Sequence, residues 1–97
     1  MRTAAYKVPG GKLIRVRFTV RDGMVNDPQI SGDFFLMPPE RLLDLEQFLI
    51  GWKLALPSGE EQLASRLGKF LVRERIELAG VDATTIARVV YLAMEDA

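Results

Sequence analysis

A strict alternation of apolar and polar residues over residues 13–21 constrains the fold more than any other feature of the sequence. Its apolar members are Ile14, Val16, Phe18 and Val20, and its polar members are Arg15, Arg17, Thr19 and Arg21. Successive side chains of a strand point to opposite faces, so this period predicts an antiparallel strand with one buried and one solvated face. Asp22-Gly23 follows directly and suits the positive φ angles of a tight hairpin turn. The sequence therefore predicts a β-hairpin in a half-solvated sheet.

Two further segments extend this sheet. The returning strand should run over residues 24–30 and be irregular at Pro28, because proline cannot donate a hydrogen bond to the ladder. Residues 3–8 predict a short edge strand, and the turn residues Pro9-Gly10-Gly11 come after it. A small antiparallel sheet of about three strands is expected.

Two adjacent phenylalanines, Phe34 and Phe35, follow the hairpin. Neighbours in an extended chain point to opposite faces, so both rings cannot enter one layer of the core. One of them is expected to face something other than this domain's own sheet. Asp33, the acid before them, should be held by a backbone N–H, a lysine or an arginine. Capping of the following turn is the more frequent role for such an aspartate, and a contact with a partner is the alternative.

A first amphipathic helix is expected to open at Pro38-Pro39-Glu40, because proline is tolerated in the first turn and an early acid suits the helix dipole. Gly51 lies where this helix could stop. The expected apolar stripe consists of Leu42, Leu45, Leu49 and Trp52, with Phe48 beside them.

Two more helices are expected. The spacing Ser58-Gly59-Glu60-Glu61 matches a capping box and precedes an apolar pattern that runs to about Arg73. A short extended link then ends at Gly80, and Asp82 is a good N-cap for the last helix. Strands before helices predict an α+β fold, with three helices packed on one face of the sheet in a single domain over residues 1–97.

The composition excludes several classes of chemistry. The 97 residues include no cysteine and no histidine, which removes thiolate chemistry, iron–sulfur ligation, Cys/His zinc sites and histidine-dependent nucleophiles. No apolar run approaches the roughly 20 residues that a membrane span needs, and the N-terminus has no signal-like apolar segment. We expect a cytoplasmic location and no membrane contact.

The net charge of zero hides a division of charge along the chain. Residues 1–21 hold six basic residues and no acid, whereas residues 22–97 hold seven basic and thirteen acidic residues. This asymmetry fits a binding edge for an anion or an acidic partner, and it fits equally a mixed solvated surface. Arg15, Arg17 and Arg21 share one face without an accompanying aromatic, so nucleic-acid binding is not expected.

Gly10-Gly11-Lys12 suggests a phosphate-binding loop, because flexible glycines expose N–H groups and lysine adds a charge. A Walker loop lies between a strand and a helix, however, and here Lys12 leads into a strand. Taken alone, the segment is better interpreted as an ordinary loop.

Three stretches together resemble the C-terminal accessory domain of lipoate–protein ligases. They are YKVPGGKLIRV at residues 6–16, ISGDFF at residues 30–35, and Leu45-Glu46 with Leu49-Ile50-Gly51. The resemblance implies a fold similar to that of iron–sulfur scaffold and sulfur-acceptor proteins, whose cysteines this chain lacks. In the family the domain is either fused to a catalytic domain or made separately. Because the chain starts at Met1 shortly before the motif, the resemblance implies the small subunit of a two-part ligase.

The resemblance further implies an accessory role with a separate catalytic large subunit, as a heterodimer. The pair would activate lipoate with ATP to lipoyl-adenylate and transfer it to a lysine of lipoyl carrier domains, in 2-oxoacid dehydrogenases or the glycine-cleavage carrier protein. ATP, Mg²⁺ and lipoate would occupy the partner's active site, and this chain alone would bind no cofactor. The alternative is a non-enzymatic protein-interaction adaptor of the same fold.

Motif position implies two groups of site residues, with no catalytic and no metal-binding residue among them. The nucleotide- or partner-facing group is Gly10, Gly11, Lys12 and Arg15, and the interface and loop group is Gly32, Asp33, Phe34 and Phe35. Lys12 is expected near the nucleotide as an electrostatic stabiliser, and Asp33 is expected to hold the loop geometry.

Overall fold

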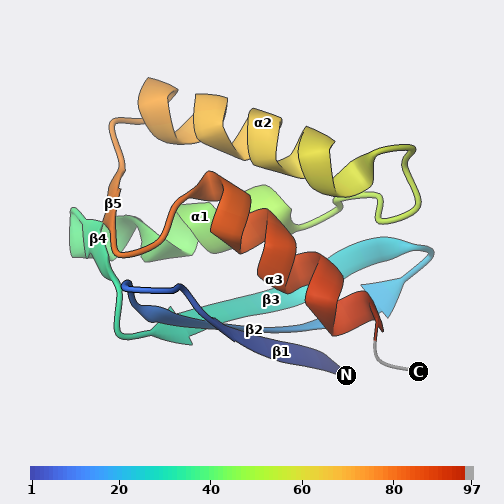
Figure 1. Ribbon diagram of the computed structural model, residues 1–97. Coiled ribbons are helices and arrows are strands. Elements are labelled where there is room, and N and C mark those ends of the chain that lie inside the picture. The colour runs from blue at the N-terminus through green and yellow to red at the C-terminus, as the bar shows by residue number, and fades with distance from the viewer. Residues whose placement is uncertain (96–97) are drawn as a thin grey trace.

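A three-stranded antiparallel sheet forms the base of the molecule in a computed structural model that describes residues 1–95 (Figure 1). Its strands are β1 (Arg2–Lys7), β2 (Leu13–Arg21) and β3 (Met24–Gly32), in the spatial order β1-β2-β3. The expected edge strand before Pro9 is therefore confirmed as β1. Among the strands of residues 1–95, it pairs with β2 alone.

The hairpin between β2 and β3 has the expected turn and the expected irregularity. Asp22 and Gly23 both have positive φ angles, 55° and 75°. The register shifts between residues 17 and 19 of β2, where Phe18 lies opposite the two residues Asp27 and Pro28. Since proline cannot join the ladder, a bulge at this position is the physical consequence of Pro28.

The alternation of β2 places its apolar residues on the face that the helices cover. Ile14, Val16 and Phe18 are at most 1% exposed. Val20, predicted to share this buried face, is 40% exposed, so that part of the prediction is wrong. Val20 follows the register shift and lies near the end of β2, beside the Asp22-Gly23 turn.

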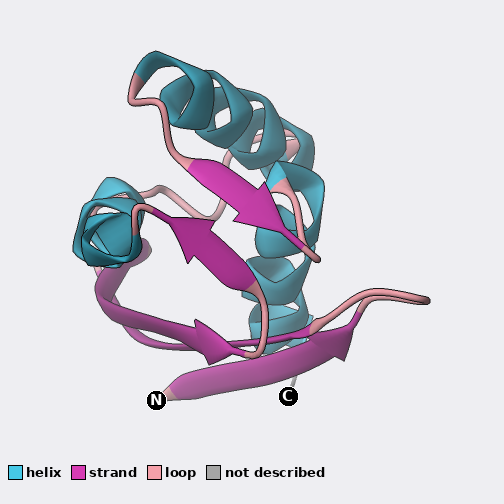
Figure 2. Cartoon of the chain, turned by 90° about the vertical axis from the view of Figure 1, so that its left-hand side faces the viewer, coloured by secondary structure: helices cyan, strands magenta, loops and turns pink. Residues whose placement is uncertain are grey.

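Three α-helices and one turn of 3₁₀-helix cover one face of the sheet. They are η1 (Pro39–Arg41), α1 (Leu42–Leu49), α2 (Gly59–Arg73) and α3 (Ala83–Glu95). Helix α1 packs on β3, α3 packs on β1 and β2, and α2 packs on α3 as the outer layer (Figures 1 and 2). The predicted α+β architecture is confirmed. Within residues 1–95, every helix is too short or too polar to traverse a bilayer.

The apolar stripe placed Trp52 in the first helix. The structure buries Trp52, but outside that helix. Helix α1 ends at Leu49, and the N–H of Gly51 donates to the carbonyl of Val25 at 2.8 Å. The N–H of Val25 in turn donates to the carbonyl of Trp52 at 3.0 Å. These bonds to β3 turn the chain out of the helix, while Trp52 remains only 8% exposed.

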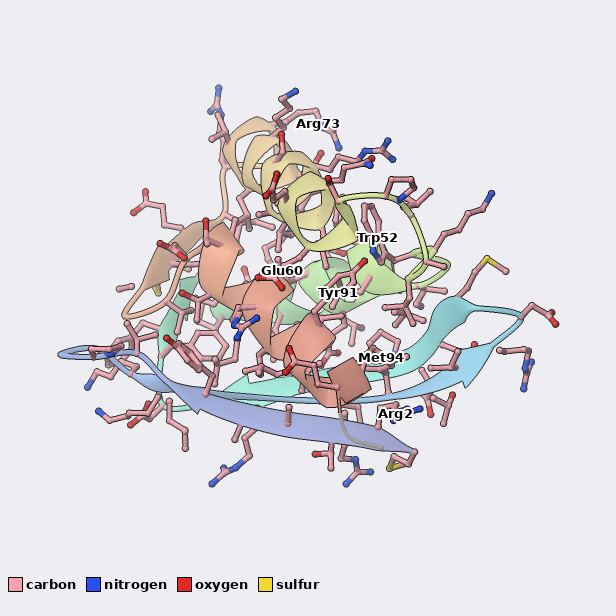
Figure 3. All side chains as sticks on the ribbon, turned by 45° about the vertical axis from the view of Figure 1, so that its right-hand side comes forward. Arg2, Trp52, Glu60, Arg73, Tyr91 and Met94 are labelled. Carbon is pink, nitrogen blue, oxygen red and sulfur yellow. The ribbon has the colours of Figure 1, made fainter. Side chains whose placement is uncertain are left out.

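The capping box expected at the start of α2 does not form. Ser58 has a left-handed backbone conformation, with a φ of 51°, and its side chain makes no capping hydrogen bond. Tyr91 from α3 lies so close that a Cβ on Gly59 would be 2.3 Å from the Tyr91 hydroxyl. That hydroxyl accepts a hydrogen bond from Trp52 Nε1 at 2.9 Å, and the two side chains point toward one another (Figure 3). Tertiary packing therefore fixes this helix start.

A second, two-stranded sheet forms from segments far apart in the sequence. Strand β4 (Phe35–Met37) pairs antiparallel with β5 (Glu77–Ala79). The extended link before Gly80 was predicted, but its pairing partner was not. The N-cap of α3 is confirmed, because Asp82 Oδ1 accepts the N–H of Thr85 at 2.8 Å.

Replacing Gly68 by alanine is expected to raise the free energy of unfolding by about 0.5–1 kcal/mol, because alanine is the better helix former. A Cβ at this position inside α2 would meet only the Cβ of Ala83, at an ordinary 3.8 Å. Urea unfolding followed by circular dichroism measures the change. Gly59→Ala is the matched control and should destabilise, because its Cβ would collide with Tyr91. A loss of stability in Gly68→Ala would contradict the described spacing of α2 and α3.

Candidate functional site

Two segments that the sequence singled out meet at one end of the sheet, where β2 begins and β3 ends. The N–H of Asp33 donates to the carbonyl of Leu13 at 3.1 Å. The N–H of Leu13 donates to Asp33 Oδ1 at 2.6 Å. This reciprocal pair fastens the Gly-Gly-Lys loop to the segment that carries the two phenylalanines. Asp33 thus caps a backbone N–H, although its side chain is exposed and not buried.

Gly32 allows this close approach. A Cβ on Gly32 would lie 2.2 Å from the carbonyl oxygen of Leu13, and its φ of 149° is a conformation that L side chains rarely adopt. Only glycine fits both conditions. The spacing of glycine and aspartate in the motif therefore has a structural cause.

A third segment, which the sequence did not indicate, completes this end of the molecule. The N–H of Lys12 donates to the carbonyl of Gly80 at 3.1 Å. A Cβ on Gly80 would lie 2.2 Å from Lys12 Cγ, so the lysine stem lies directly against this glycine. Gly80 follows β5 and is distant in sequence from Lys12, and no local pattern could have joined them.

The half-buried Lys12 and the exposed Phe35 form the solvent-facing part of the site. The ammonium nitrogen of Lys12 lies 5.8 Å from the centroid of the Phe35 ring, within cation–π range. Phe35 is 61% exposed, and Met37 on the same side of β4 is 55% exposed. Phe34 instead packs against the core, so the prediction that one phenylalanine faces away is confirmed. We call Lys12, Phe35 and Met37 the Lys12–Phe35 surface.

The Gly-Gly-Lys loop has the geometry of an ordinary tight turn. The N–H of Gly11 donates to the carbonyl of Val8 at 2.8 Å, and the N–H of Lys12 is bonded to Gly80. Lys7 Nζ donates to the carbonyl of Gly11 at 2.9 Å. The N–H groups of Gly11 and Lys12 are therefore engaged, and the Lys12 ammonium is the part of these two residues that can meet a ligand.

Arg15 belongs to a different surface. It pairs with Ala5 of β1 and Ser31 of β3, and its exposed side chain alternates with the buried Ile14 and Val16, so it lies on the opposite face of the sheet. Figure 2 shows that the helices lie on the other face. Arg17 lies on the same face as Arg15, and both arginines line a shallow hollow of about 490 Å³. The structure thus groups Gly10, Gly11 and Lys12 with the phenylalanine segment, but not Arg15.

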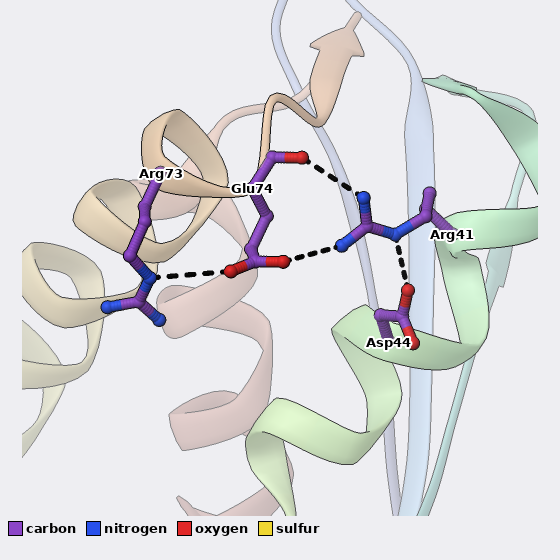
Figure 4. A network of polar contacts seen from close by, with 4 residues as sticks. All are labelled: Arg41, Asp44, Arg73 and Glu74. Carbon is purple, nitrogen blue, oxygen red and sulfur yellow. Dashed lines mark hydrogen bonds and ion pairs between the residues drawn. The ribbon is translucent and has the colours of Figure 1, made fainter.

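A polar network ties the segment after β4 to the segment before β5 (Figure 4). Arg41 of η1 donates to Asp44, to Glu74 Oε1 at 2.8 Å and to the carbonyl of Glu74 at 3.1 Å. The hydrogen bonds of Asp44, and then of Glu74, raise the pKa of the Arg41 guanidinium above its ordinary value. This network supports the β4–β5 pair and, through it, the position of Phe35.

The described residues contain neither a cluster of metal ligands nor a buried polar side chain. Within residues 1–95, no three His, Cys, Asp or Glu side chains are placed to hold a metal ion together. In the same range, no polar or charged residue is buried, so no shielded acid–base pair exists there.

Replacing Asp33 by alanine is expected to lower the free energy of unfolding by about 1 kcal/mol, because a backbone N–H loses a charge-assisted bond at an exposed position. The partners are Asp33 Oδ1 and the N–H of Leu13. Asp33→Asn keeps an acceptor and should lose less. Urea unfolding of both variants measures the difference. Equal stability of Asp33→Ala and the parent chain would contradict this role.

Comparison with known proteins gives two matches. The family model of the bacterial lipoate protein ligase C-terminus matches residues 3–87. A chain in a solved structure of an archaeal lipoylation system, a bi-partite lipoate protein ligase and its E2 lipoyl domain from Thermoplasma acidophilum, is similar in fold. It shares 24% identity at a TM-score of 0.71, and the similarity covers 92% of each chain, so the two chains are of similar length. No curated protein matches.

Proposed function

Because this chain belongs to the family of bacterial lipoate protein ligase C-terminal domains, we propose that it is the accessory subunit of a two-part lipoate–protein ligase. In this proposal, a separate catalytic subunit holds ATP, Mg²⁺ and lipoate, and the present chain is required for forming lipoyl-adenylate. The lipoyl group then passes to a lysine of a lipoyl carrier domain, in a 2-oxoacid dehydrogenase or the glycine-cleavage carrier protein. The fold match to a chain of a bi-partite lipoate protein ligase structure supports a role in a ligase of this two-part kind.

The observation that carries this proposal is the Lys12–Phe35 surface. It combines an exposed aromatic ring, an exposed methionine and a cation, which is the composition of an interface anchor. Its backbone is held by the Asp33–Leu13 hydrogen bonds and by Gly80, so little ordering remains to be done on binding. Such a surface becomes useful when another protein covers it.

Within this surface, Phe35 would anchor the partner and Lys12 would stabilise negative charge on the nucleotide. The aliphatic part of the Lys12 side chain packs against Gly80, and this contact restricts the position of the ammonium group. Gly10 and Gly11 shape the turn before it, and Gly32 and Asp33 hold the turn in place. Arg15 reaches the same partner only if that partner also covers the open face of the sheet.

A lipoylation assay tests the proposal. The chain is mixed with the catalytic subunit of its source organism, ATP, Mg²⁺, lipoate and a lipoyl carrier domain, and lipoylation is followed by intact mass. Each subunit alone should leave the carrier unmodified, and the mixture should modify it. A catalytic subunit that lipoylates the carrier equally well alone would contradict the accessory role. An adaptor outside lipoylation would instead co-purify with no ligase.

Replacing Lys12 by methionine is expected to slow lipoyl-adenylate formation about 10-fold while leaving affinity for the catalytic subunit nearly unchanged, because methionine keeps the stem packing and removes the charge. Rapid-quench measurement of adenylate in the assembled pair gives the rate. Lys7→Met is the matched control, since its ammonium donates to the nearby carbonyl of Gly11. Unchanged adenylate formation in Lys12→Met would remove Lys12 from the nucleotide site.

A further inference from the structure

A second hollow, of about 430 Å³, lies between α2 and the segment that follows α1. Three cations of α2, Arg66, Lys69 and Arg73, line it, together with Trp52 and Phe48. None of the described residues that line it is acidic. These cations are at positions i, i+3 and i+7 of a helix and therefore share one face. The net charge of the chain is zero, so this positive hollow is a local feature.

The two arginines are held by aromatic rings. Arg66 Cζ lies 5.6 Å from the centroid of the Trp52 ring, and Arg73 Cζ lies 5.8 Å from that of Phe70. A guanidinium stacked on a ring keeps the N–H groups of its edge available to an oxyanion. The rings are themselves fixed, because Trp52 Nε1 donates to Tyr91 and the Phe70 ring packs 4.6 Å from that of Phe48.

The donors of these cations are only weakly engaged within the chain. The contact of Arg66 with Gln62 is 3.5 Å long, and that of Arg73 with Glu74 is 3.4 Å long. Lys69 makes no hydrogen bond or ion pair with the described part of the chain. Most of the N–H groups around the hollow therefore face solvent and are free to meet a ligand.

We propose that this hollow binds the di- or triphosphate group of a small phosphate-bearing anion. Three cations converge on one small volume, and a di- or triphosphate concentrates several negative charges in such a volume. Trp52 is only 8% exposed and its ring lies under Arg66, while Phe48, the other aromatic residue of the lining, packs against the Phe70 ring, so neither ring is well placed to stack on a base. The site recognises the phosphates and not the base. This inference depends only on the hollow and is independent of the accessory role.

The only tryptophan of the chain, Trp52, lies in the hollow and reports on its occupancy. Titration with sodium diphosphate, at an ionic strength kept constant with sodium chloride, should produce a saturable change in tryptophan fluorescence. Isothermal titration calorimetry should give comparable affinities for diphosphate and for the triphosphate of ATP, and no heat with adenosine. Binding of ATP without binding of diphosphate would overturn the proposal, since it would make the base the recognised part.

Substitutions of the residues that line the hollow test whether diphosphate binds there. Removing both arginine charges by Arg66→Gln with Arg73→Gln should weaken diphosphate binding at least about tenfold in calorimetry, because two charge-assisted contacts are lost. Lys69→Gln leaves both stacked rings untouched and should weaken binding as well. The matched control, Arg17→Gln with Arg21→Gln, removes the same charge from the open face of the sheet and should bind as the parent does.

Three results would overturn the site. The first is the absence of saturable diphosphate binding. The second is an unchanged affinity for diphosphate in the Arg66→Gln, Arg73→Gln variant. The third is a loss of affinity in the open-face control as large as the loss in that variant. Saturable binding of a poly-glutamate peptide in the absence of diphosphate binding would also overturn it, and would assign the hollow to protein carboxylates.

Discussion

Replacing Phe35 by aspartate is expected to weaken binding of the chain to its catalytic subunit by about 100-fold or more. Removal of an aromatic anchor costs about 2–4 kcal/mol in an interface, and a desolvated charge in its place adds to the loss. Phe35 is 61% exposed in the free chain, so the fold should be retained. Surface plasmon resonance with the immobilised catalytic subunit measures the affinity.

Val72 provides the matched control for this substitution. It lies on α2 outside the Lys12–Phe35 surface and is 81% exposed, more than Phe35. Val72→Asp introduces the same charge and should bind the catalytic subunit like the parent chain. Undiminished binding by Phe35→Asp would remove this ring from the interface. Equal losses in both variants would mean that added negative charge, and not the position, weakens binding.

Replacing Gly32 by alanine is expected to lower the free energy of unfolding by about 3 kcal/mol or more. The new Cβ would lie 2.2 Å from the carbonyl oxygen of Leu13, a backbone atom that moves only if β2 and β3 separate at this end. That separation would also break the Asp33–Leu13 hydrogen bonds. In a domain of this size, the loss corresponds to a fall in Tm of roughly 12–24 °C, measurable by circular dichroism.

Gly10→Ala separates steric collision from backbone strain. Gly10 also has a positive φ, 72°, but a Cβ there would meet no atom within 4 Å. Only the left-handed backbone conformation should then cost free energy, about 1–2 kcal/mol. A Gly32→Ala variant no less stable than Gly10→Ala would contradict the close approach of Gly32 to Leu13.

The parts of the fold that could be predicted from sequence are those that local patterns determine. The alternation of β2 up to Phe18, the Asp22-Gly23 turn and the Asp82 cap each depend on a few neighbouring residues, and the structure has all three. The failures come from contacts between distant segments. Tyr91 alters the start of α2, and the bonds of Val25 to residues 51 and 52 shorten α1. The β4–β5 pair likewise joins segments about 40 residues apart.

The candidate site shows the same division. The motif pieces with Lys12 and Phe35 were found from sequence, and the separation of Arg15 from them could have been inferred from the alternation, since odd and even residues of a strand face opposite sides. Lys12 and Gly80 are 68 residues apart in the sequence, so no local sequence pattern predicts their contact. In the cationic hollow of α2, the shared face of the three cations can be predicted from their helical spacing in the sequence. The final position of Trp52 beside them cannot.

The most direct test of the accessory role is lipoate-dependent exchange of labelled diphosphate into ATP by the catalytic subunit, measured with and without this chain and in the absence of any carrier domain. Exchange reports the adenylation step alone. We expect exchange only when the chain is present, with Phe35→Asp failing to support it at concentrations where the parent chain saturates. Full exchange by the catalytic subunit on its own would contradict the account.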